Sequence, residues 1–330
     1  MRNWWKWLGA AILLYVFIAG LLVPLKPGIT NLTPTAARTG DELKLEVKGY
    51  NSHFAQAEDS MRVWLRLEEG YNLAARQIEV HDEETALAHF TLPEYLPIDN
   101  RVGEAAVIVD NAIDGTTVLS GVMLIRQDSI NPARGQAGWP KGGLDELHSF
   151  NGFAFPFLNN LEESIRNLYF HVALWFAMTL LLLTSVIYSV RYLRHPQHFD
   201  HDYWAMALAS AGVTFGFLGL TTGAIWARYT WGSFWSWDIK QILTLIALMI
   251  YLAYFVLRTA FPDQERRGRV SAVYNIFAFV AMLILIGVLP RLESVESLHP
   301  GNGGNPGLGG EDLENTMKAV FYPAIIGWTL

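Results

Sequence analysis

The chain has 330 residues, of which 52% are hydrophobic and 17% are charged, and its formal net charge is −7. It is too apolar for an ordinary soluble protein of this size, and its negative charge argues against a nucleic-acid-binding protein. Because it contains no cysteine, disulfides, thiolate metal sites and thiol nucleophiles are excluded.

Residues 1–27 are predicted to hold the first transmembrane helix. An apolar run, Trp7–Val23, follows the basic residues Arg2 and Lys6 and is close to the ~20 residues that cross a bilayer. A cleaved signal peptide is the alternative, but no clear A-x-A cleavage site follows the run. We therefore expect an uncleaved span.

Residues 28–128 are predicted to form an all-β, immunoglobulin-like sandwich. The stretch DELKLEVKGY alternates apolar and polar residues as a half-buried strand does, and turn signals such as RTGD and IDGTT separate similar short runs. Residues 129–165 are rich in Gly, Pro and Asn and are expected to be a connector, with an interfacial helix beginning near NNLEESIR.

Four longer apolar blocks follow, and none contains Asp, Glu, Lys or Arg: Asn167–Val190, Trp204–Ala227, Gln241–Leu257 and Val270–Pro290. A last apolar piece, Ala319–Leu330, would span only about 18 Å as a helix at ~1.5 Å per residue. The sequence leaves open whether this sixth helix is complete. It predicts a polytopic α-helical membrane protein of about six transmembrane helices with an inserted all-β, Ig-like extracytoplasmic domain.

Basic residues orient the bundle by the positive-inside rule. The connections RYLRHPQHFDHD and RTAFPDQERRGR should face the cytoplasm, as should the N-terminus. The β domain, the tryptophan-rich loop at residues 226–238 and the segment around His299 would then lie outside.

The loop WARYTWGSFWSWD, residues 226–238, holds four of the chain's twelve tryptophans. One reading is an aromatic belt at the headgroup layer of the membrane. The small residues Gly232, Ser233 and Ser236 between the large rings instead leave room for a planar ligand to stack. Asp238 is expected to cap the helix that follows, with Gln241 completing a capping box.

Two histidines are expected at the same membrane face as this loop. His171 lies just inside a transmembrane block, where a histidine is costly and either serves a function or bonds a neighbouring helix. His299 lies in the loop SLHPG and could be a plain loop residue. Two imidazoles beside a tryptophan platform would suit the axial positions of haem iron. His195, His198 and His201 form an H-x-x-H-x-x-H run that is read as a solvated loop, with a weak metal site as the alternative.

These motifs resemble those of a known family. WGSFWSWD resembles the WWD signature of the haem-handling proteins of cytochrome c maturation, and the CcmC type matches best. RNLYFHV resembles the first histidine motif of that type and LHPG resembles the second, in the same order along the chain. The resemblance covers about residues 163–330, so residues 166–330 are expected to form the haem-handling membrane domain with its WWD loop at 226–238. The β domain lies outside it.

The resemblance implies a set of haem-binding residues and no catalytic residue. His171 and His299 would be the axial ligands of the iron, and the tryptophans and Asp238 would line the haem. Arg166, Lys240 and, as a weaker candidate, Arg228 would pair with the propionates. The full set is His171, His299, Trp226, Trp231, Trp235, Trp237, Asp238, Arg166, Lys240 and Arg228. The chain departs from the family pattern at Phe234, where tryptophan is common, and at Ala173, where proline is usual.

The expected cargo is haem b, held non-covalently because the chain has no cysteine. By resemblance, the protein would sit in the bacterial inner membrane and deliver haem to a CcmE-type chaperone, together with a CcmA/CcmB-type ABC transporter and a CcmD-type small subunit. It would be a delivery component rather than an enzyme, although it could assist covalent attachment of haem to the chaperone. The alternative is a CcsA-type haem transporter and cytochrome c synthase, whose motif usually continues WDPKE where this chain has WDIKQ. A non-haem membrane adaptor built around the β domain is a third reading.

Overall fold

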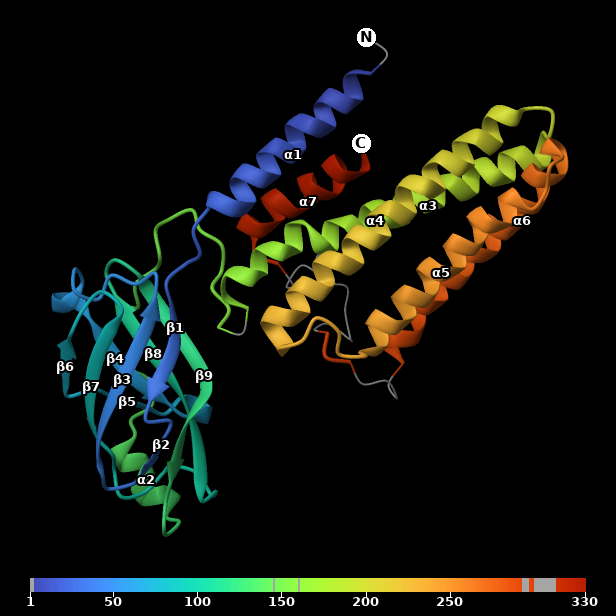
Figure 1. The fold of residues 1–330 in the computed structure, drawn as a ribbon. Coiled ribbons are helices and arrows are strands. Elements are labelled where there is room, and N and C mark those ends of the chain that lie inside the picture. The colour runs from blue at the N-terminus through green and yellow to red at the C-terminus, as the bar shows by residue number, and fades with distance from the viewer. Residues whose placement is uncertain (1–2, 145, 160, 293–296, 300–312) are drawn as a thin grey trace. The chain divides into compact units, whose positions relative to one another are not determined.

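The computed structural model describes residues 3–144, 146–159, 161–292, 297–299 and 313–330. The chain divides into two compact units, one formed by residues 24–162 and the other by residues 1–23 together with 163–330. The first unit is rich in strands and the second is helical (Figure 1).

The first unit is a β-sandwich. One sheet has the order β1-β3-β7-β6 and the other β2-β9-β8-β4-β5, with antiparallel pairing except between β2 and β9. The strands are β1 (Gly28–Thr33), β2 (Ala36–Arg38), β3 (Glu42–Tyr50), β4 (Arg62–Arg66), β5 (Asn72–Ala74), β6 (Gln77–Val80), β7 (Thr85–Thr91), β8 (Val102–Asn111) and β9 (Gly115–Arg126), with short 3₁₀ turns η1 (Glu58–Ser60) and η2 (Glu68–Gly70).

The predicted alternation of apolar and polar residues places the apolar side chains of each strand in the core of this sandwich. In β3 the side chains of Leu43, Leu45 and Val47 are buried, and the residues between them point outward or are partly exposed. Leu45 pairs with Ala88 of β7, which is also fully buried. Each strand therefore contributes one apolar face, as the period of two requires.

The β unit is longer than the predicted 28–128. The region expected to be a connector packs onto the sandwich through Trp139, which follows the short helix α2 (Pro132–Gly138) and is completely buried in the same core. Backbone bonds tie the segment down at two further points, from the Asn72 N–H to the Pro140 carbonyl (2.9 Å) and from the Thr116 N–H to the His148 carbonyl (3.0 Å). Its Gly- and Pro-rich composition gave no alternating pattern to indicate this packing.

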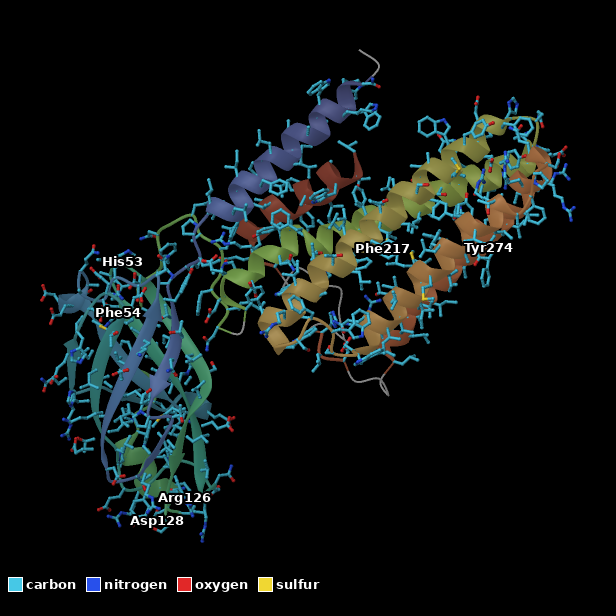
Figure 2. All side chains as sticks on the ribbon, in the orientation of Figure 1. His53, Phe54, Arg126, Asp128, Phe217 and Tyr274 are labelled. Carbon is cyan, nitrogen blue, oxygen red and sulfur yellow. The ribbon has the colours of Figure 1, made fainter. Side chains whose placement is uncertain are left out.

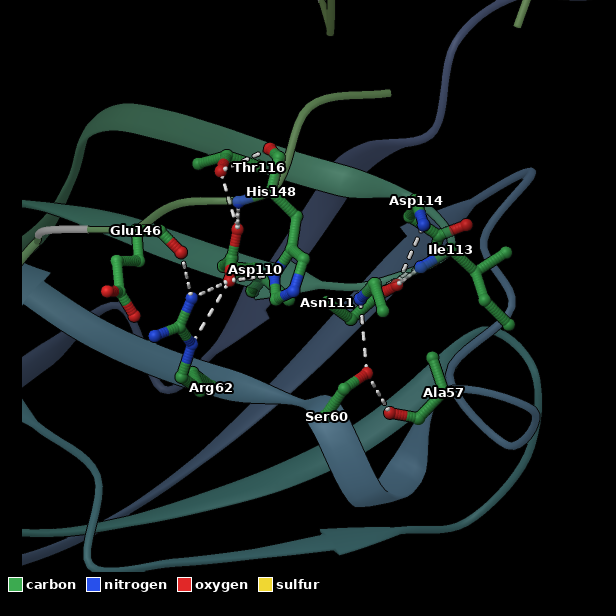
Figure 3. Close-up of polar contacts among 12 residues, drawn as sticks. Ala57, Ser60, Arg62, Asp110, Asn111, Ile113, Asp114, Thr116, Glu146 and His148 are labelled. Carbon is green, nitrogen blue, oxygen red and sulfur yellow. Dashed lines mark hydrogen bonds and ion pairs between the residues drawn. The ribbon is translucent and has the colours of Figure 1, made fainter. Parts of the chain in front are cut away.

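A buried carboxylate holds part of that segment in place. Asp110, at the end of β8, accepts hydrogen bonds from the Arg62 guanidinium (2.6 Å), the Thr116 hydroxyl (2.6 Å) and both the backbone N–H (2.7 Å) and the ring of His148 (2.8 Å) (Figure 3). Burial alone would raise the pKa of Asp110, but these donors outweigh it and lower the pKa to about 2. The ionised carboxylate thus joins β4, β9 and the segment after residue 140.

The second unit is a helical bundle. It consists of α1 (Trp4–Leu22), the 3₁₀ segment η3 (Glu162–Tyr169), α3 (His171–Arg194), α4 (Phe199–Trp231), α5 (Ile239–Thr259), α6 (Gln264–Met282), a π-helical turn η4 (Leu283–Val288), a 3₁₀ turn η5 (Leu289–Arg291) and α7 (Asn315–Thr329). Where the sequence predicted an interfacial helix, the chain forms the 3₁₀ segment η3. Side chains along the middle of the long helices are mostly apolar, and Phe217 of α4 is still 37% exposed (Figure 2).

Within the described residues, five helical segments are long and apolar enough to cross a membrane: Trp4–Leu22, Glu162–Arg194, Phe199–Trp231, Ile239–Thr259 and Gln264–Arg291. The sequence predicted about six. The expected sixth piece is helical, but α7 has only 15 residues. It packs along α1, where the Tyr15 hydroxyl donates to the Ala319 carbonyl at 3.0 Å.

Glycines let α3 and α4 approach closely. Added Cβ atoms at Gly212, Gly219 and Gly223 would come within 2.8, 2.9 and 2.6 Å of Leu182, Trp175 and His171 of α3, respectively. Small residues at three- and four-residue spacing are the usual way for helices to pack inside a membrane. These glycines allow the start of α3 to pack against the end of α4.

Buried polar groups fix the bundle's other contacts. The Arg258 guanidinium of α5 donates to both carboxylate oxygens of Asp202 on α4 at 2.6 and 2.7 Å. The Asn275 amide of α6 donates to the hydroxyls of Ser185 and Ser189 on α3 at 2.7 and 2.9 Å. Because such groups are costly in a membrane unless they are paired, these contacts specify which helix faces which.

Candidate functional site

A cavity of about 180 Å³ lies within the helical unit, between the start of α3, the end of α4, the start of α5 and the turns η4 and η5 that follow α6. Both histidines singled out in the sequence line it, together with Trp235 and Lys240. Its other lining residues are Trp175, Leu220, Gly223, Ala224, Gln241, Thr244, Ile286 and Pro290. Segments far apart in the chain therefore bring two imidazoles, two indoles and an ammonium to one space.

His171 is the first residue of α3 and is 9% exposed. Its Nδ1 lies 2.9 Å from the Gly219 carbonyl and 3.2 Å from the Thr222 hydroxyl. Its Nε2 lies 3.3 Å from the indole Nε1 of Trp175, which can only donate. The tautomer is therefore fixed: Nδ1 carries the proton and donates to Gly219, and Nε2 keeps a lone pair.

The ring of His171 fits against a residue without a side chain. A Cβ at Gly223 would lie 2.6 Å from its Cε1 atom. Trp226, one turn further along α4, meets the same ring edge-on at 5.8 Å between centroids and donates its N–H to the Ser164 hydroxyl at 3.1 Å. The end of α4 thus shapes the pocket in which the imidazole is held.

His299 is held by Asp238. The Nδ1 atom of His299 lies 2.9 Å from the Asp238 carboxylate, so Nδ1–H donates and Nε2 keeps its lone pair. Burial lowers the pKa of His299 and the Lys240 ammonium adds to the decrease, whereas the Asp238 carboxylate opposes it. The Trp231 ring packs edge-on against the imidazole at 4.8 Å.

Asp238 serves both the helix and the histidine. Its carboxylate caps α5 by accepting from the Lys240 N–H at 2.9 Å, and it also accepts from the Leu298 N–H at 2.7 Å and the Ser297 hydroxyl at 2.9 Å. Burial raises the pKa of Asp238, but these donors outweigh it and the pKa is lowered.

The expected capping box does not form. The Gln241 side chain instead accepts from the Ser236 backbone N–H at 3.0 Å. The Gln241 side chain reaches past the N-cap residue Asp238 to Ser236, because the chain turns sharply at Trp237, whose φ is +58°.

The tryptophans do not form one flat platform. Trp226 and Trp231 belong to α4, which continues to Trp231 and ends at Gly232 with φ +81°, so the loop is shorter than residues 226–238. Trp235 lines the cavity, and Trp237 stands at 89° to it and is 75% exposed. Trp226 and Trp231 each pack edge-on against one of the two histidines.

Of the three predicted basic partners, only Lys240 lines the cavity among the residues that the structure describes. The Arg166 guanidinium donates to the carbonyls of Gly20 (3.0 Å) and Val23 (2.6 Å), where α1 ends, and also contacts Glu163. Arg228 is exposed and donates to the Gly232 carbonyl at 2.7 Å. Unsatisfied carbonyls at helix ends attract cations, and this accounts for both positions.

Four residues missed by the sequence reasoning belong to the site. Trp175 stands four residues after His171, a spacing that places both on one helix face and could have indicated their contact. Gly223 follows the glycine spacing of α4, and Gln241 and Thr244 follow one another along one face of α5. Polar or small residues recurring on one face of an apolar helix were the available signal.

The departures at Phe234 and Ala173 leave the histidines in place. Phe234 is 58% exposed, and Ala173 is fully buried.

His195, His198 and His201 have ring centroids 6.3 and 5.9 Å apart in sequence order. Over the described part of the chain, no group of three His, Cys, Asp or Glu side chains could hold a metal ion.

The donor set suits an iron porphyrin better than a bare metal ion. Two imidazole Nε2 lone pairs, aromatic walls and one cation match the axial positions, the faces and the propionates of haem. The enclosed volume is below the ~300–1,000 Å³ of most small-molecule sites, so a macrocycle needs more space than the cavity itself encloses.

Known proteins similar in sequence to this chain have names that refer to haem export or cytochrome c biogenesis. Residues 152–302 match the family described as CcmC, Heme exporter protein C. Heme exporter protein C of Bradyrhizobium diazoefficiens is 31% identical over 121 residues, which are 37% of this chain and 43% of that protein. Cytochrome c biogenesis protein CcsA of Pelargonium hortorum is 33% identical over 105 residues (32% of each chain), and that of Arabidopsis thaliana is 32% identical over 97 residues (29% of each chain).

The matched segments span less than half of these curated relatives. Most of the β unit, residues 24–151, lies outside the family match. The match does include the histidine at the start of α3, the tryptophan-rich turn and the second histidine, which are the parts that converge on the cavity. Residues 152–302 are therefore similar in sequence to the CcmC/CcsA-type haem-handling proteins of cytochrome c maturation.

Proposed function

We propose that the protein binds haem non-covalently between His171 and His299 and delivers it to a haem chaperone during cytochrome c biogenesis. The observation that carries the proposal is that both imidazoles line one cavity with their Nδ1–H groups engaged, so that each Nε2 is the ligating atom, although the Trp175 N–H now meets that of His171 at 3.3 Å. Neutral imidazoles of this kind are the usual nitrogen ligands of haem iron.

The surrounding residues would fix how the cargo is held. Asp238 and the Gly219 carbonyl orient the two rings, as acceptors behind a ligating histidine commonly do. Lys240 is the cation best placed for a propionate, and Trp231 and Trp235 give apolar contact area. Because no covalent bond joins the cargo to the chain, the same site can release it.

The proposed orientation places the site on the outer side of the bacterial inner membrane. Arginines lie at the end of α3 and at the start of α6, next to the α3–α4 and α5–α6 connections, whereas the tryptophan-rich turn and His299 lie at the opposite helix ends. Basic connections favour the cytoplasmic side. The β unit would then also be extracytoplasmic, and we propose that it helps dock a CcmE-type chaperone or the CcmA/CcmB- and CcmD-type subunits.

Direct attachment of haem to apocytochrome is the second candidate, since relatives named CcsA match this chain as well as one named Heme exporter protein C. A transfer assay separates the two. Haem-loaded protein would be mixed with either a purified CcmE-type chaperone or an apocytochrome c carrying C-x-x-C-H.

Haem leaving for the chaperone supports delivery. Thioether formation on the apocytochrome without a chaperone supports the synthase. Variants His171→Ala and His299→Ala are the controls, because each removes one proposed ligand.

A further inference from the structure

A second opening lies beside the cavity, between α3 and the end of α6. It measures about 290 Å³ and is lined by Trp175, Phe176, Met178, Thr179, Met282, Leu283, Ile286 and Gly287. None of these residues is charged, and the Thr179 hydroxyl is already bonded to the Trp175 carbonyl at 2.8 Å. We call this opening the apolar groove.

In a membrane, the groove would open toward lipid. Its walls come from two segments long and apolar enough to cross a membrane, and Leu283 on its rim is 43% exposed. On one side the wall is the π-helical turn η4 rather than regular α-helix. Such turns commonly occur at functional positions, where they widen the helix.

The groove and the histidine cavity share two lining residues, Trp175 and Ile286. The Trp175 indole stands between them, at 88° to the His171 ring and 5.8 Å from it. Its N–H reaches His171 Nε2 at 3.3 Å, longer than the ~2.7–3.2 Å of an ordinary hydrogen bond and therefore weak. Trp175 thus separates two spaces and also occupies the lone pair of a proposed iron ligand.

We propose that haem reaches its site laterally from the lipid through the apolar groove, and that the Trp175 side chain is the gate between groove and cavity. This inference rests on the proposed function, since it assumes that the cavity receives haem. Haem is the committed occupant because the groove adjoins the histidine cavity, with which it shares Trp175 and Ile286, and its described lining carries no charge.

Moving Trp175 would do two things at once. It would join two volumes that together fall within the ~300–1,000 Å³ typical of small-molecule sites, whereas the cavity alone does not. It would also free the Nε2 lone pair, while the Nδ1 contacts to Gly219 and Thr222 keep the imidazole ring in place. Admission of haem and availability of the ligand are thereby coupled.

Gly287→Trp tests the route. Gly287 lines the groove, and a Cβ there would meet only the Arg291 guanidinium, at 3.9 Å, so this position has space for a larger side chain. The matched control is Val288→Trp, the same residue placed on an adjacent, 52% exposed position outside the described groove lining.

Haem-free full-length protein would be reconstituted in lipid nanodiscs and mixed with vesicles that carry haemin, and the Soret band would be followed in time. We expect Gly287→Trp to load at least tenfold more slowly than Val288→Trp and to reach the same final spectrum. Trp175→Phe, which removes the N–H and part of the wall, should load faster than the wild type.

Equal loading rates for Gly287→Trp and Val288→Trp, with a normal final spectrum, would overturn the lateral route and leave the proposed function standing. Loading by Trp175→Phe that is no faster than wild type would overturn the gate. A wild-type protein that never develops a two-histidine spectrum would overturn the proposed function and this inference with it.

Discussion

Replacing Asp238 by Asn should weaken haem binding without undoing the start of α5. Asn is as good an N-cap as Asp, so its side-chain oxygen can still accept from the Lys240 N–H. It cannot serve every donor that now meets the carboxylate, which include the Leu298 N–H at 2.7 Å and the His299 ring at 2.9 Å. The NH₂ group of the new Asn side chain would face one of these donors, and that hydrogen bond would be lost.

The size of the effect follows from the lost contact. A hydrogen bond to a charged group contributes about 1.5–3 kcal/mol, and every ~1.4 kcal/mol is a factor of ten in affinity. We therefore expect haem affinity at neutral pH to fall about 10–100-fold, the range found when an acceptor behind a ligating histidine is removed. Asp263→Asn is the matched control, because Asp263 caps α6 through the Arg266 N–H at 2.7 Å.

The pH dependence gives a sharper signature. Protonated His299 has no lone pair for iron, so haem affinity should fall as pH drops through the pKa of His299. Asp238 raises that pKa, against the stronger effect of burial. In Asp238→Asn the break in a plot of log Kd against pH should therefore move to lower pH, even though binding is weaker. The role given to Asp238 would be refuted if Asp238→Asn bound haem as tightly as the Asp263→Asn control at every pH. A break moved to higher pH would refute it as well.

Three further predictions concern the other ligand, its packing and the β unit. His171→Ala should leave one axial imidazole, turn the spectrum partly high-spin and respond to added imidazole; an unchanged spectrum would remove His171 from the ligand set. Gly223→Ala should reduce haem retention, since the added Cβ would lie 2.6 Å from the His171 ring, whereas haem content equal to that of Ala224→Gly would show that the close contact is unimportant. Residues 24–162 expressed alone should melt cooperatively, because the unit has its own core, and should lose stability as pH falls below ~4 toward about 2, where the native Asp110 carboxylate protonates. Asp110→Asn should be less stable at neutral pH and lose this acid dependence, as calorimetry can check.

Local patterns predicted the secondary structure well. The alternation in Glu42–Tyr50 and the uncharged apolar blocks each required only neighbouring residues, and both elements formed. The packing of Trp139 into the β core could not be predicted, because its segment has no period. The short α7 formed a helix whose partner, α1, comes from the other end of the chain.

The site was foreseeable in its parts but not in its contacts. His171 and His299 could be chosen from their motifs, and the structure places both on one cavity. The pairing of Asp238 with His299 joins residues 61 positions apart, and no local rule indicates it. Arg166 was proposed as a propionate partner only because the resemblance matches it to a basic residue of the family, and its guanidinium donates to the carbonyls at the end of α1.

The central claim is that His171 and His299 together hold haem, and the absorption spectrum of the full-length protein purified from haem-replete cells tests it most directly. The account predicts a low-spin spectrum of two imidazole ligands, with all of the haem extracted by acid acetone because no bond joins it to the cysteine-free chain. A preparation without a Soret band, a purely high-spin spectrum, or haem that stays with the chain after extraction would contradict it.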